Sequence, residues 1–239
     1  MSTIHSQANP VALPRESDDH AAGNQLSVVA NASSVKRVLR NTYALLAMTL
    51  LFSAGVAGIS HTAQLPVPGL VVTLAGFFGL LFAIHKLQNT GWALLAVFGL
   101  TGFMGYTLGP LLTHSLALPG GAQTVTLALA ATGGTFVALS GYALVSRRDF
   151  NFLGGFLFVG MVIAVVMGIA SFFLQIPALG LAVAASVALL SAGLILYETS
   201  RIISGGERNY VLATVGLYVS VFNLFTALMS LLGVGTSHD

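Results

Sequence analysis

Apolar residues run through this chain in seven long stretches that short polar connectors separate. A helix rises about 1.5 Å per residue and needs about 20 apolar residues to cross the roughly 30 Å hydrocarbon core of a bilayer. Each stretch reaches or nearly reaches that length, so the pattern predicts an all-α integral membrane protein, a bundle of seven transmembrane helices. The stretches are Tyr43–Ser60, Val67–His85, Trp92–Leu112, Val125–Val145, Phe152–Leu174, Ala178–Glu198 and Val211–Leu232.

The basic residues follow the same seven-fold division, because all of them fall before the first stretch or in alternate connectors. They are Arg15, Lys36, Arg37, Arg40, Lys86, Arg147, Arg148, Arg201 and Arg208. The connectors in between and the tail after residue 232 contain no Lys or Arg. Loops rich in Lys and Arg remain in the cytoplasm. The pattern therefore predicts a cytoplasmic N-terminus and a C-terminus on the outer side.

Composition excludes several classes of protein. Charged residues make up 7% of the chain, against roughly 25% in an average soluble domain, so the chain cannot cover itself with a solvated surface. The basic residues form no stripe interleaved with aromatic residues, which argues against nucleic-acid binding. The chain has no Cys, and its six His residues show no metal-ligand spacing, so we expect no metal and no cofactor.

Residues 1–38 are predicted to form a cytoplasmic tail, and residues 39–239 the membrane domain. The segment 1–34 is polar and lacks sustained periodicity, so we expect it to be disordered. Val35, Val38 and Leu39, which follow this segment, share one helical face beside the basic residues Lys36, Arg37 and Arg40. That face either lies among the lipid headgroups or belongs to a simple basic anchor.

One acidic residue continues an apolar stretch, and it is the main candidate for a functional site. Glu198 ends the sixth stretch, and a carboxylate inside a membrane span is a functional candidate because it is costly to bury. Two interpretations stay open: Glu198 faces the bundle interior, or it reaches the headgroups and pairs with Arg201. In the seventh stretch, Ser220 and Asn223 share a face with Tyr218 nearby, either as part of the site or as interhelical hydrogen-bonding groups.

The last two stretches also carry a family resemblance. The runs Leu196–Tyr210 and Ala213–Phe225, the first of which contains the Gly-Gly-Glu turn that joins the last two spans, resemble the C-terminal signature of the Bax inhibitor-1 family, and more narrowly its bacterial YccA branch. This resemblance implies a bundle whose C-terminal helix is central. It also implies a multi-pass protein of the bacterial inner membrane, with its C-terminus in the periplasm.

The resemblance implies two functions. Family members with channel activity carry one carboxylate on the sixth span and one on the seventh, which act as a proton-sensitive gate for calcium leak. Here the matching positions are Glu198 and Ser220, so half of the charge is missing. The YccA branch is associated with the membrane AAA protease FtsH, as substrate and modulator. We therefore expect a non-enzymatic modulator and substrate of FtsH, with a pH-sensitive leak of calcium, other cations or protons as the alternative. In that alternative Glu198, Ser220 and Asn223 form the gate, supported by Arg201 and Tyr218.

Overall fold

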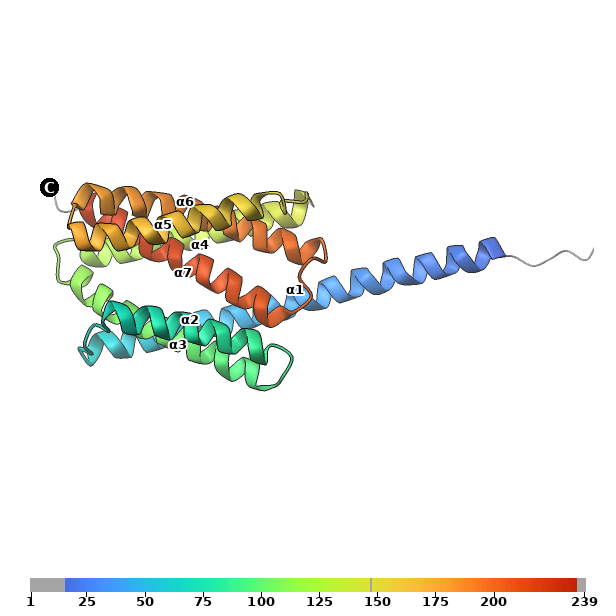
Figure 1. Cartoon of the computed structure of the whole chain (residues 1–239), viewed down its shortest axis with the longest axis horizontal. Helices are drawn as coiled ribbons and strands as arrows, with labels where there is room; N and C mark the ends of the chain where they lie inside the picture. Colours follow the sequence, from blue (N-terminus) through green and yellow to red (C-terminus); the bar gives the residue numbers. More distant parts are fainter. Residues whose placement is uncertain (1–15, 147, 236–239) are drawn as a thin grey trace, which may run out of the picture.

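The computed structural model describes residues 16–146 and 148–235, and these form seven helices (Figure 1). Each helix contains a stretch that is long and apolar enough to cross a membrane. The predicted all-α, seven-helix membrane fold is therefore confirmed. The helices are α1 (Glu16–Thr62), α2 (Leu70–Leu87), α3 (Trp92–Leu116), α4 (Gly121–Ser146), α5 (Leu153–Leu174), α6 (Pro177–Ile203) and α7 (Tyr210–Gly235).

Helix α7 lies at the centre of the bundle. It packs against α1, α3, α4 and α6, while α2 packs mainly on α3 and α5 mainly on α6. In Figure 1, α1 to α3 lie on one side of α7 and α4 to α6 on the other. Half of the spanning window of α7 is buried, a larger share than in any other described span. The predicted central position of the C-terminal helix is confirmed.

Helices α1 and α3 approach closely because two glycines of α3, four residues apart, face small residues of α1. A Cβ atom on Gly105 would collide with the backbone of Ser53, and one on Gly109 would collide with the side chain of Ser60. Pro110 lies inside α3 and has no N–H to donate to the carbonyl of Tyr106 four residues earlier. The Ser60 hydroxyl donates to that carbonyl instead, over 3.0 Å. A neighbouring helix thus satisfies the acceptor that the proline leaves open.

The turn between α6 and α7 is defined by residues at both helix ends. Gly205 adopts a left-handed conformation with φ of 74°, which favours glycine and is typical of the residue just after a helix. Asn209 precedes the first residue of α7, and its side-chain oxygen accepts the Val211 N–H over 2.9 Å. This is a capping contact. The side-chain amide of Asn209 also donates to the Gln88 carbonyl over 3.1 Å, which ties α7 to the connector after α2.

The N-terminal segment differs from the disordered tail that we expected. Helix α1 begins at Glu16, so residues 16–34 continue the helix that enters the bundle, and Figure 1 shows this part of α1 projecting beyond the other helices. The segment contains four Ala and no Pro, and extending an existing helix avoids the cost of a new nucleus. Residues 1–15 of the expected tail lie outside the described residues. The division of the chain at residue 38 stays a prediction.

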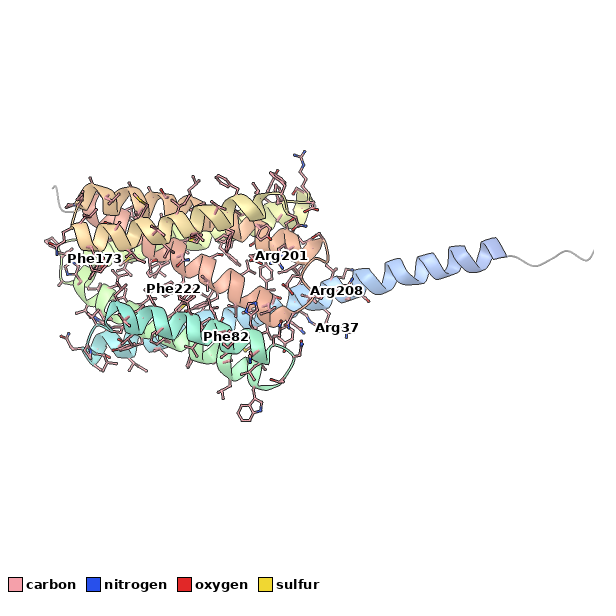
Figure 2. All side chains as sticks on the ribbon, in the orientation of Figure 1. Arg37, Phe82, Phe173, Arg201, Arg208 and Phe222 are labelled. Carbon is pink, nitrogen blue, oxygen red and sulfur yellow. The ribbon has the colours of Figure 1, made fainter. Side chains whose placement is uncertain are left out.

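The described basic residues gather at one end of the bundle, where α1 enters and where α2, α4 and α6 end. Figure 2 labels Arg37, Arg201 and Arg208 at this end and Phe173 at the other. We expect reporters fused after Arg148 or Gly206 to report a cytoplasmic location and those fused after Ala63, Ala117 or Asp239 an external one. A cytoplasmic signal after Asp239 would contradict the predicted orientation of the seventh span.

Candidate functional site

A single guanidinium joins two carboxylates where α6 meets the turn to α7. Arg201 Nη1 lies 3.4 Å from Glu198 Oε2, and Arg201 Nη2 lies 3.0 Å from Glu207 Oε2. The two glutamate side chains are only 14% and 13% exposed, and that of Arg201 is 30% exposed. The guanidinium also lies over the Tyr197 ring, with its carbon 5.6 Å from the ring centroid. This bridge couples the last turns of α6 to the connector that leads into α7.

The Glu198 carboxylate faces the central helix at Gly216. A Cβ atom on Gly216 would lie 2.9 Å from the carboxylate carbon, so only a residue without a side chain leaves room for this approach. The side chain therefore combines the contact with α7 of the first interpretation with the Arg201 pair of the second, three residues further along α6. Its role in a gate stays a prediction.

The candidate residues on α7 do not all join Glu198. Ser220 is buried, and its hydroxyl donates to the Gly216 carbonyl over 2.9 Å, one turn beyond the contact with Glu198. Asn223 lies seven residues from Gly216, about 10 Å along the helix axis. The Tyr218 hydroxyl contacts Ser53 Oγ over 2.6 Å and donates to the Thr101 carbonyl over 3.2 Å. Tyr218 therefore links α7 to α1 and α3 instead of supporting Glu198.

Two residues of this site were missed by the sequence analysis. Glu207 enters the sequence analysis only as part of the Gly-Gly-Glu turn, yet it accepts hydrogen bonds from Arg201 and, over 2.9 Å, from the Asn209 N–H. Gly216 was passed over among the many glycines of the spans. A signal for it existed in the four-residue spacing of Gly216 and Ser220, because small residues at that spacing mark close helix contacts in membranes.

The residues that follow Glu198 fix the end of α6 to other parts of the bundle. Thr199 Oγ1 lies 3.4 Å from the Tyr43 hydroxyl and 3.3 Å from Ser140 Oγ, which connects α6 to α1 and α4. The Ser200 hydroxyl donates to the Arg148 carbonyl and accepts the Phe150 N–H, which holds the connector between α4 and α5. Glu198 thus projects from an anchored helix end.

The bridge of Glu198, Arg201 and Glu207 suits a charge-dependent latch between α6 and the turn that follows it better than a calcium-binding site. Calcium prefers six to eight oxygen ligands, with carboxylates supplying the charge. Here both carboxylates already bind one guanidinium, and residues 16–146 and 148–235 hold no group of three His, Cys, Asp or Glu side chains that could bind a metal. Protonation or displacement of Glu198 would remove the contact of the guanidinium with the carboxylate that faces α7, and protonation or displacement of Glu207 would remove its contact with the turn.

Comparison with known proteins places the whole membrane domain in one family. Residues 35–237 match the family model described as inhibitor of apoptosis-promoting Bax1. The chain is 48% identical over 200 residues to the modulator of FtsH protease YccA of Escherichia coli K12. This match covers 84% of this chain and 91% of that protein. An uncharacterized protein of Pseudomonas aeruginosa is 48% identical over 213 residues, covering 89% of this chain and 96% of that protein.

The comparisons also bear on the predicted location. A protein of Escherichia coli O6:H1 that is 48% identical over 200 residues is named inner membrane protein YccA, and the match covers 84% of this chain and 91% of that protein. Together with seven helices in the described chain that can span a bilayer, this confirms the prediction of a multi-pass inner-membrane protein.

Proposed function

Because the chain belongs to the Bax inhibitor-1 family, as the match over residues 35–237 shows, we propose that it is a non-enzymatic modulator of the membrane AAA protease FtsH. The observation that carries this proposal is the 48% identity to the YccA modulator over 84% of this chain. Identity at this level over most of both chains favours a shared mode of action over a shared fold alone. We propose further that the chain is itself a substrate of that protease.

The shape of the molecule supports both roles. From residue 16 to residue 33, where the first span begins, α1 extends for about 25 Å, beyond the other helices (Figure 1). An ATP-driven protease needs an accessible end to engage, and chain ends are preferred sites of proteolytic attack. The bundle itself is anchored by buried polar contacts between helices, such as that of Tyr218 with Ser53. A protease that engages the projecting part of α1 would meet this packed membrane domain behind it.

The projecting part of α1 gives a direct test of whether the protease engages the chain from its N-terminus. Removal of residues 1–34 is expected to leave the bundle folded, since the deleted part lies before the packed core, and to lengthen the half-life of the protein in cells that contain FtsH. Removal of residues 236–239 is the matched control and should change the half-life little. Pulse-chase measurements with and without active FtsH separate proteolysis from dilution. An unchanged half-life of a deletion variant that unfolds at the wild-type temperature would contradict engagement from the N-terminus.

A second candidate function is an ion or proton leak controlled at Glu198. The observation that favours it is the Glu198 carboxylate, which faces the central helix and is held by a guanidinium that also binds Glu207. Opening such a latch would change the packing of α6 on α7. On the outer side of Glu198, however, the interface between α6 and α7 continues with a cluster of buried apolar side chains, Ile195, Val221 and Leu224. This cluster supports the modulator over the leak.

A further inference from the structure

A groove at the basic end of the bundle adjoins the site described above and shares Glu207 with it. It has a volume of about 600 Å³ and runs between the start of the first span, the end of α4 and the turn between α6 and α7. Val38, Leu39 and Leu144 line its apolar part, and Lys36 and Arg208 line its polar part. The groove therefore combines an apolar wall with two cations at the level where the spans emerge from the bundle.

The charge of the groove is positive. Lys36 and Arg208 are exposed, and neither has an ion pair among the described residues. The one acidic residue that lines the groove is Glu207, and its carboxylate already binds Arg201 over 3.0 Å. An anion that enters the groove thus meets two cations without an ion-pair partner among the described residues, and one acid that shares the Arg201 guanidinium with Glu198.

The position of the groove indicates which anion it takes. Lys36 lies three residues inside the first span, and Arg208 lies two residues before α7, so both cations stand near the membrane surface. The neighbouring apolar wall suits a hydrocarbon chain, whereas a soluble phosphate or an acidic peptide would leave it uncovered. Basic pockets between transmembrane helices on the cytoplasmic side are known to bind anionic lipid headgroups.

We propose that this groove binds an anionic phospholipid, with the phosphate between Lys36 and Arg208 and the upper part of an acyl chain along Val38, Leu39 and Leu144. The lipid also contacts the connector that carries the latch, because Gly205 and Glu207 line the same groove. Gly205 packs toward α1, because a Cβ atom added to this glycine would lie 3.9 Å from Cγ2 of Val35. A lipid in this groove therefore contacts both α1 and the turn between α6 and α7. This binding does not depend on the proposed protease function.

The test compares two double variants of the full-length chain. Lys36→Gln with Arg208→Gln removes the two cations that line the groove. Arg37→Gln with Arg40→Gln removes the same amount of charge from exposed residues of the same end that do not line it. Retention of phosphatidylglycerol and of phosphatidylcholine by the purified protein is measured by native mass spectrometry, in detergent with each lipid added separately. Neither variant touches the packed core, so both are expected to fold.

We expect the wild-type protein and the Arg37/Arg40 variant to prefer phosphatidylglycerol. The affinity of the Lys36/Arg208 variant for this lipid should fall by roughly tenfold or more, since each basic residue near a membrane surface contributes about 1 kcal/mol. Its retention of phosphatidylcholine should be unchanged. Equal losses of phosphatidylglycerol affinity in both variants would indicate diffuse attraction to the basic surface and would contradict binding in the groove. An unchanged Lys36/Arg208 variant, or displacement of the lipid by excess glycerol phosphate, would overturn it as well.

Discussion

Replacement of Gly216 by valine is expected to lower the midpoint of thermal unfolding by several degrees. The new side chain would enter the space that the Glu198 carboxylate occupies, because even a Cβ atom there lies 2.9 Å from the carboxylate carbon. Overpacking of this kind costs about 1–3 kcal/mol, and a domain of this size loses roughly 2–4 °C per kcal/mol. The measurement is the unfolding midpoint of the detergent-purified protein.

A matched control and a rescue separate the collision from the effect of valine on a helix. Gly134 lies inside α4, and a Cβ atom there meets nothing within 4 Å, so Gly134→Val carries only the change in helix propensity, which is small and favours valine over glycine. Glu198→Ala in the Gly216→Val background should restore part of the lost stability, because the two side chains then no longer compete for one space. Equal losses at Gly216 and Gly134, without rescue, would contradict the contact between Glu198 and α7.

Replacement of Arg201 by methionine is expected to destabilise the protein more strongly. Both carboxylates would lose their bridging cation, and removal of one partner from a buried ion pair costs about 3–5 kcal/mol. Arg201 is 30% exposed, and solvent screens the exposed part of the pair, so we expect about 3 kcal/mol at most. The free energy of unfolding in a denaturant titration measures the loss.

The same bridge predicts which second substitutions restore stability. Glu198→Gln together with Glu207→Gln removes both unpaired charges, so these changes should recover much of the stability of the Arg201→Met protein. Arg40→Met is the control, because Arg40 is exposed and substitutions of this kind usually stay within about 0.5 kcal/mol. The stability of the Arg201→Lys protein should fall between those of the wild-type and Arg201→Met proteins, since one ammonium cannot reach both glutamates as a planar guanidinium does. A loss at Arg201 no larger than that at Arg40 would show that the bridge contributes nothing.

The sequence predicted most of the fold because membrane insertion is governed by local hydropathy. A run such as Phe152–Leu174 is sufficient to identify a span, and the structure places α5 at Leu153–Leu174. The start of α1 was not predicted, because composition alone does not indicate that a helix continues outward from an anchored span. The central position of α7 came from the family resemblance and not from hydropathy, since apolar surface that faces lipid and apolar surface that faces protein look alike in a sequence.

The site was predicted only in part for a similar reason. Glu198 and Arg201 are three residues apart on one helix, so their pairing follows from helical spacing. The pairing of Arg201 with Glu207 depends on the left-handed Gly205, after which the Glu207 N–H donates to the Arg201 carbonyl over 3.1 Å. Tyr218 and Asn223 seemed to belong with Ser220 because they are close along the chain. Which side of α7 each side chain faces is decided by packing across the bundle, and for Tyr218 that packing is with α1 and α3.

The central claim is that this chain modulates FtsH and does not conduct ions, and one reconstitution tests it directly. Purified FtsH is placed in proteoliposomes with a membrane substrate, with or without this chain, and calcium entry is recorded from the same vesicles. We predict that the chain slows degradation of the substrate and that calcium entry stays at the level of empty vesicles. An unchanged degradation rate, together with calcium entry that Glu198→Gln abolishes, would contradict the account and establish the leak as the function.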